Sequence, residues 1–190
     1  NMSKSDFLNE IILCSKYLED AVKIKINSFR APDFTIRKDN LWLLKILAEQ
    51  GFKSDSSIFP LKTRRYGIHG WFPYPHVITF DNKNKITELP VATLPLKFIN
   101  LPIGGGGYFR LIPYMLLKLG LRYFHQPDNP LILYSHPYEF NVIEDQLDHR
   151  NRPYIYSKTQ VLGRNNFLKN LAMLSKEYSF IRVCDYLNEY

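Results

Sequence analysis

The first part of the chain alternates between helical and extended patterns. Apolar residues recur at helical spacing from Phe7 to Val22, and Ser3 stands three residues before Asp6, the spacing of a capping box. This pattern predicts an amphipathic helix of roughly five turns that covers a sheet. A short strand is expected over Ile26–Phe29, and it must end before Pro32 because proline has no N–H to donate to a neighbouring strand.

A second helix and strand follow in the same order. Asp39 or Asn40 can cap a helix that contains Leu41–Leu44 and stops at Gly51. Phe52–Phe59 then returns as an extended segment. The order helix, strand, helix, strand is typical of βα units, so the predicted fold class is α/β.

The segment between Pro60 and Pro75 is a long loop rich in aromatic and basic residues. Exposed rings lower solubility unless they pack or bind something. Tyr66, Trp71 and Tyr74 are therefore expected either to stack on sugar rings or to pack onto the rim of the fold, and the pattern favours neither. Two strands, residues 76–80 and 86–91, then flank a polar tip and predict a hairpin.

Four consecutive glycines, Gly104–Gly107, precede a helix that Pro113 opens and that covers residues 114–124. The phosphate-binding pattern G-x-x-x-x-G-K-[ST] is absent, so the glycines predict a close backbone approach near a pocket. A strand over Leu131–Ser135 ends at His136, and a charged loop runs to Arg152. Ser157 can cap a last helix over about residues 157–177, and a final strand is expected at residues 179–183.

Arg30 and His136 each follow an expected strand. Catalytic groups of α/β folds gather where parallel strands end, so these two residues are the leading candidates for one shared site. The alternative is that Arg30 pairs with a surface carboxylate and that His136 is a hydrogen-bonded loop histidine.

Composition narrows the class of protein. With 190 residues, 45% hydrophobic and 23% charged, the chain is expected to form a single globular domain, residues 1–190, with insertion loops at about 60–110. The formal charge is +7, but the basic residues are scattered apart from Lys62, Arg64 and Arg65, so nucleic acid is not the expected partner.

No apolar run approaches the length of about 18 residues that a transmembrane helix needs. Cys14 and Cys184 lie in apolar segments without C-x-x-C spacing and are expected to be buried free thiols.

Five short motifs follow one another along the chain: Phe29–Pro32, Asp55–Pro60, Tyr66–Gly67, Gly105–Arg110 and Tyr134–Glu139. Their order resembles that in bacterial polysaccharide deacetylases of the NodB-homology group, carbohydrate esterase family four. Over nearly all of residues 5–190 the chain resembles the exopolysaccharide-associated branch of these enzymes.

This resemblance implies a distorted (β/α) barrel and a hydrolase of carbohydrate metabolism that acts on a carbon–nitrogen bond. Such an enzyme removes N-acetyl groups from an amino-sugar polysaccharide with a divalent metal, usually zinc. His136 matches the general acid that protonates the leaving amine, and Arg30 matches the arginine that tunes the aspartate base. Asp33 falls where a backbone N–H helps to hold the oxyanion. Leu133 and Tyr134 would line the acetyl pocket; the residues loosely expected to contact substrate are Tyr66, Trp71, Tyr108 and Arg110.

The chain departs from the family pattern in its metal motifs. The Asp-Asp pair and the His-x-x-x-His motif lie upstream of the helix that begins near Ser3, and His69, His76, His125 and His149 do not replace them. The zinc ligands are therefore expected upstream of this chain, which carries no metal residues and is not active alone. The barrel is then incomplete, and the missing half is truncated, supplied by another chain or lost. A catalytically inactive carbohydrate-binding homologue is the alternative, and a bacterial cytoplasm or cell envelope location is left open.

Overall fold

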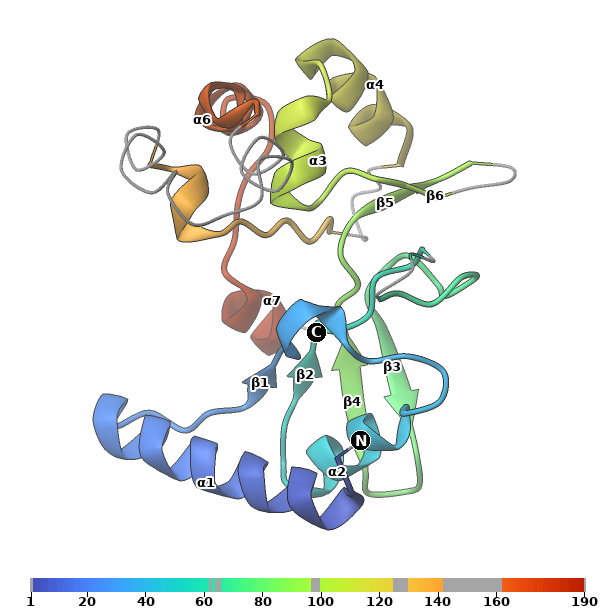
Figure 1. The fold of residues 1–190 in the computed structure, drawn as a ribbon, viewed down its shortest axis with the longest axis vertical. Coiled ribbons are helices and arrows are strands. Elements are labelled where there is room, and N and C mark those ends of the chain that lie inside the picture. The colour runs from blue at the N-terminus through green and yellow to red at the C-terminus, as the bar shows by residue number, and fades with distance from the viewer. Residues whose placement is uncertain are drawn as a thin grey trace, which may run out of the picture. The chain divides into compact units, whose positions relative to one another are not determined.

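The computed structural model describes residues 2–61, 63, 66–96, 100–124, 130–141 and 162–189. The chain divides into two compact units, Asn1–Pro90 and Val91–Tyr190, and Figure 1 labels the helices and strands of each. The elements of the two units are mixed helices and small sheets, which confirms the α/β class. The sheets described form no closed barrel.

Unit 1 is built on a sheet with the strand order β1-β2-β4-β3. Strands β1, β2 and β4 run parallel, and β3 is antiparallel to β4. The predicted hairpin is therefore confirmed, and so are the short strands before and after the second helix. The elements are α1 (Lys4–Val22), β1 (Ser28–Phe29), η1 (Pro32–Phe34), α2 (Trp42–Glu49), β2 (Ser54–Asp55), β3 (His76–Thr79) and β4 (Lys85–Glu88).

Helix α1 begins with the predicted capping box. The Asp6 N–H donates to Ser3 Oγ at 3.1 Å, and the Ser3 N–H donates to Asp6 Oδ2 at 3.2 Å. Phe7 is buried, and its ring meets Phe29 of β1 and Trp42 of α2 edge-on at about 6 Å. Beyond Ile11 the apolar side chains of α1 are exposed, so only the first half of the helix covers the sheet.

Helix α2 lacks the cap that its sequence suggests. Leu41 occupies the N-cap position and makes no side-chain capping bond. Asn40 instead closes the preceding turn, where its Oδ1 accepts from the Arg37 N–H at 2.6 Å. The capping prediction was wrong by one residue, because Asn40 stabilises the turn before the helix rather than the helix itself.

The core of unit 1 lies between the two helices and the sheet. Its residues come from both helices, from β4 and from the segments that flank the strands. The buried cluster comprises Phe7, Ile11, Ala31, Ile36, Leu44, Leu47, Ala48, Phe52, Ile58, Ile68 and Ile86.

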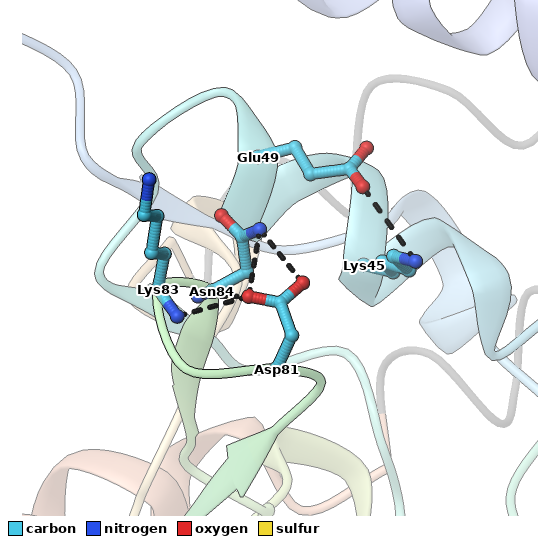
Figure 2. Close-up of polar contacts among 5 residues, drawn as sticks. All are labelled: Lys45, Glu49, Asp81, Lys83 and Asn84. Carbon is cyan, nitrogen blue, oxygen red and sulfur yellow. Dashed lines mark hydrogen bonds and ion pairs between the residues drawn. The ribbon is translucent and has the colours of Figure 1, made fainter.

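The tip of the β3–β4 hairpin is polar and exposed, as predicted. Asp81 Oδ1 accepts from the N–H groups of Lys83 and Asn84, both at 2.9 Å, and the Asn84 side chain donates to the same carboxylate (Figure 2). The hydrogen bonds from Asn84, together with that from Lys83, lower the pKa of Asp81. Figure 2 also shows the exposed Lys45–Glu49 pair of α2, whose charged atoms are 3.8 Å apart.

Unit 2 places helices beside the antiparallel pair β5–β6. Among the described residues, the predicted strand at residues 131–135 appears as two isolated parallel bridges, Ile132 with Val91 and Tyr134 with Gly105. Helices α3 and α6 pack through Phe109 and Phe167, whose ring centroids are 5.3 Å apart. The elements are β5 (Thr93–Pro95), β6 (Asn100–Pro102), α3 (Gly106–Leu111), α4 (Tyr114–Phe124), η2 (Pro137–Glu139), α6 (Arg164–Leu174) and α7 (Val183–Glu189).

The end of the chain corrects several predictions. Residues 179–182 form no strand, and Val183 begins helix α7 instead. The last long helix is α6, which begins after Gly163, while Ser157 lies outside the described residues. Cys14 and Cys184 are free, as predicted, but both are exposed, which corrects the prediction that they are buried. Within the described ranges, no helix combines the length and the apolar character that crossing a membrane requires.

Candidate functional site

The parallel strands of unit 1 end in a group of polar residues, which we call the strand-end cluster: Arg30, Asp55, Ser56, Ser57 and Glu88. Phe29 is in register with Asp55, and Asp55 is in register with Glu88. The cluster therefore lies at one level, at the carboxyl ends of β1, β2 and β4. Asp55, Ser57 and Glu88 have no exposed surface.

Arg30 is bound to the strand beside it. Its Nε donates to the Ser56 carbonyl at 2.9 Å, and its Nη2 donates to Ser56 Oγ at 2.6 Å. Ser56 Oγ in turn donates to the Leu89 carbonyl at 2.6 Å. The guanidinium also lies 5.7 Å from the centre of the Phe34 ring. These contacts fix the cation at the end of the sheet.

Ser57 joins Asp55 to the first strand. Its N–H and hydroxyl donate to the two oxygens of Asp55 at 2.8 and 2.6 Å. The same hydroxyl oxygen accepts from the Ala31 N–H at 2.7 Å. Asp55 is thereby held by two donors within its own strand end, and the residue after Arg30 is held by the same serine.

Asp55 and Glu88 form a buried acid pair. Burial raises the pKa of Asp55, although hydrogen bonds with Glu88 and Ser57 oppose this effect. Burial also raises the pKa of Glu88 well above its ordinary value of 4.5, and the negative charge of Asp55 and the hydrogen bond to it act in the same direction. Because Ser57 donates two hydrogen bonds to Asp55, the proton of the pair resides on Glu88. Its Oε1 accepts from the Ile58 N–H at 3.2 Å, and no N–H or O–H group of the described residues donates to Oε2.

Asp33 lies in an unusual turn directly after β1. Both Asp33 and Phe34 have positive φ angles, 54° and 51°, in the left-handed region that bulky residues rarely adopt. The buried Phe34 ring packs against Phe59 with a centroid distance of 5.3 Å, which holds the turn in place. Strained backbone of this kind is enriched at functional sites. The predicted oxyanion role of Asp33 stays a prediction.

The aromatic loop packs onto unit 1 at two of the predicted positions. Trp71 is half-buried against the core cluster, and Tyr66 packs against Phe34 and Phe59. These contacts support the packing interpretation for both rings. Phe72 is the more exposed ring of the loop, and it contacts Tyr74 at 5.6 Å.

In unit 2, His136 lies at the surface immediately before the 3₁₀ turn η2. Its ring stacks on Tyr138 at 5.1 Å with an interplanar angle of 9°, and Tyr134 meets it edge-on at 5.7 Å. Arg164 lies 5.1 Å from the centre of the Tyr138 ring. The imidazole is therefore exposed to solvent while aromatic contacts define its position.

Glu139 holds the backbone of His136 through a hydrogen bond. It is fully buried, and its Oε2 accepts from the His136 N–H at 3.0 Å. Its Oε1 accepts from Arg110 Nη1, also at 3.0 Å, in an ion pair with almost no exposed surface. The burial of Arg110 favours a structural role over the predicted contact with substrate, whereas Tyr108 in the same helix is exposed.

The glycine run makes room for this segment. A Cβ at position 105 would lie 2.8 Å from the Tyr134 ring, and a Cβ at position 106 would overlap the Glu139 carboxylate. The run thus allows the close approach that the sequence predicts, although Gly106 also begins helix α3, which the sequence did not suggest.

Leu133 and Tyr134 face different surroundings. Leu133 helps to line a cavity of about 560 Å³ in unit 2, together with Leu121, Leu174 and residues 177–183. Tyr134 instead covers Gly105 and contacts His136. Of the two expected acetyl-pocket residues, only Tyr134 lies beside His136 in these contacts.

Arg30 belongs to unit 1 and His136 to unit 2, so their predicted meeting in one site stays a prediction. Sequence reasoning missed Asp55, Glu88 and Glu139 as site residues. Signals were present: Asp55 and Glu139 lie within the motifs that carry the resemblance, and Glu88 interrupts an otherwise apolar strand end.

The chain matches the model of a domain of unknown function, DUF3473, over residues 56–188. The chain belongs to this family. The DUF3473 match includes Glu88, His136 and Glu139, and it begins one residue after Asp55. Neither the curated proteins nor the solved structures contain a match to the chain.

Proposed function

We propose that the full-length protein is a metal-dependent deacetylase that removes N-acetyl groups from an amino-sugar polysaccharide of a bacterium. In this proposal the DUF3473 chain carries the general-acid half of the active site, within an incomplete barrel of the NodB-homology type. The five ordered motifs support the assignment to polysaccharide deacetylases, and the geometry of the strand ends supports an enzyme.

The observation that carries the proposal is the strand-end cluster. Three adjacent parallel strands finish at one level with Arg30, Asp55 and Glu88. Ligand and catalytic sites of open α/β sheets form at the carboxyl ends of parallel strands. A fixed guanidinium beside two buried carboxyl groups costs stability, and such groups with perturbed pKa values are concentrated at functional sites.

His136 would protonate the leaving amine. Its imidazole is exposed, and histidine is the side chain that most often serves as a general acid. The backbone anchor from Glu139 and the stack on Tyr138 support this role, because a general acid has to stand within hydrogen-bond reach of the leaving nitrogen.

Arg30 would hold an aspartate base in its ionised form. A guanidinium close to a carboxylate lowers the pKa of that carboxylate and so keeps it able to accept a proton. The base is expected outside this chain, since Asp55 is fully buried and already accepts from Ser57. The exposed position of Arg30, directly after β1, is compatible with such a contact.

The edge of the sheet supports a contribution from further polypeptide. Among the described strands, β1 pairs with β2 alone. The second half of α1 exposes Leu18 and Val22, each about half accessible. Parallel sheets are normally covered, so an edge strand beside an apolar helix face fits the packing of another βα unit.

The metal would be held outside this chain as well. The described residues include no group of three or more His, Cys, Asp or Glu side chains that could bind a metal ion. They therefore do not fit a zinc site by themselves, and the roles proposed for Arg30 and His136 involve no ligand from this chain.

The test is acetate release by the full-length protein from N-acetylated oligosaccharides, with and without added Zn²⁺. We expect metal-dependent release, and we expect His136→Ala to lower kcat by roughly a hundredfold to ten-thousandfold while the protein remains folded. Tyr123→Ala, which changes an exposed ring in α4 of the same unit, is the matched control and should keep full activity. Full activity of His136→Ala would remove this residue from the mechanism.

A carbohydrate-binding homologue without activity is the second candidate, and the exposed Phe72 ring favours it. Aromatic rings at the surface are suited to stacking on sugars, and Phe72 lies beside Tyr74 and His76. Oligosaccharide binding that Phe72→Ala abolishes, in a protein that releases no acetate with any divalent metal, would favour this candidate.

A further inference from the structure

We infer that Glu139 is a positioning residue for His136 and that Arg110 is the buried counter-ion of Glu139. This inference rests on the proposed function, because it assigns the roles of two further residues in the same reaction. The evidence for it comes from the contacts of the Glu139 carboxylate within unit 2.

The carboxylate of Glu139 binds two different groups through its two oxygens. One oxygen accepts from the His136 N–H and the other from Arg110 Nη1, each at 3.0 Å. Helix α3 thus donates to one oxygen, and the segment that carries His136 donates to the other. The hydrogen bond to His136 is stronger than one to a neutral acceptor, because the acceptor is ionised and shielded from water.

Removing either charge alone would leave the other charge buried without compensation, which is strongly destabilising. Glu139 also has little freedom to move, since its carboxylate occupies the space above Gly106 where any other residue would place a Cβ. The imidazole is held by its backbone anchor on one side and by the Tyr138 stack. The ring can therefore lie at the surface and still keep one position, as a proton donor requires.

Two double variants of the full-length protein test the inference. Arg110→Met/Glu139→Gln and Arg110→Met/Glu139→Met both remove the ion pair. They differ in one respect: only the glutamine keeps an oxygen that can accept from the His136 N–H. Melting curves are used to check that both variants fold. Replacing both charges avoids the uncompensated buried charge that a single variant would leave.

We expect the Met/Met variant to have a kcat about a hundredfold below that of the Met/Gln variant, with KM unchanged, because a displacement of about 1 Å is enough for such a loss. Hydrogen exchange of the His136 amide should be faster in the Met/Met variant by at least about tenfold, as expected when a hydrogen bond to this amide is lost.

Equal kcat values in the two variants, with faster exchange in Met/Met, would show that the anchor is structural only and would overturn the inference. Equal exchange rates would overturn it as well, since the anchor itself would then be absent. If the wild-type full-length protein releases no acetate, the proposed function fails and the catalytic role of Glu139 fails with it. In that case the hydrogen-exchange rates still test whether Glu139 accepts a hydrogen bond from the His136 N–H.

Discussion

Replacing Glu88 with glutamine should remove a pH dependence from the stability of unit 1. Glutamine has the shape of a protonated glutamate, so its oxygen can accept from the Ile58 N–H as Glu88 Oε1 does. Its N–H₂ group would replace Oε2, which has no hydrogen-bond partner among the described residues. The variant thus retains the contact with the Ile58 N–H without a carboxyl proton that can be lost.

The sign follows from the raised pKa of Glu88. In the unfolded chain this carboxyl loses its proton near the ordinary value of 4.5, whereas burial and Asp55 keep it protonated in the folded protein. The stability that this proton contributes is therefore fully present at pH values below the ordinary pKa of 4.5. This contribution is lost as the pH rises through the raised pKa of Glu88 in the folded protein. One proton that the folded protein holds and the unfolded chain releases corresponds to a slope of roughly 1 kcal/mol per pH unit.

Tryptophan fluorescence during urea unfolding measures this effect selectively. Both tryptophans of the chain, Trp42 and Trp71, pack against the core of unit 1. The free energy of unfolding should fall with pH more steeply in the wild type than in Glu88→Gln, so that the variant gains relative stability toward pH 7. Glu49→Gln, at an exposed position of α2, should keep the wild-type slope. Parallel curves for wild type and Glu88→Gln from pH 5 to pH 8 would refute the shared-proton interpretation.

Three further predictions concern the same two sites. Gly106→Ala should destabilise unit 2 by roughly 1–3 kcal/mol and displace His136, because the new methyl group overlaps the Glu139 carboxylate. Gly107→Ala is the control, since a Cβ at this position meets nothing within 4 Å. Thermal melting of both alanine variants measures the difference. Ser57→Ala should lower the free energy of unfolding of unit 1 by roughly 1–3 kcal/mol, because the Ser57 hydroxyl donates to Asp55 and accepts from a buried backbone N–H. An unchanged midpoint of urea unfolding would contradict this role of the serine. Arg30→Ala should raise the pKa of the ascending limb in the pH profile of deacetylation, since it removes a cation beside the proposed base; the same profile in wild type and variant would reduce Arg30 to a structural link to Ser56.

Local patterns predicted much of unit 1. The capping box at Ser3, the hairpin before Glu88 and the short parallel strands follow from spacing and turn chemistry, which act over a few residues. The sequence could not show that Asp55 and Glu88 are partners, because strand register joins residues 33 positions apart. Periodicity identifies strands but does not pair them.

The errors in unit 2 have a common physical origin. The run around Cys184 has the apolar character of a strand, yet it forms helix α7, and short apolar segments leave this choice to tertiary contacts. Glycine is a poor helix former, so a helix beginning at Gly106 was not expected. The packing of Glu139 there requires glycine and so overrides the local preference. The candidate residues Arg30 and His136 were found because each follows a short apolar run.

The exposure of the two thiols offers a practical use. Cys14 belongs to one unit and Cys184 to the other, and the chain has no further cysteine. A dye or spin label attached to each would form a donor–acceptor pair that spans both halves without any engineered mutation. Such a pair would record, in solution and in real time, whether adding an oligosaccharide changes the distance between the two labels.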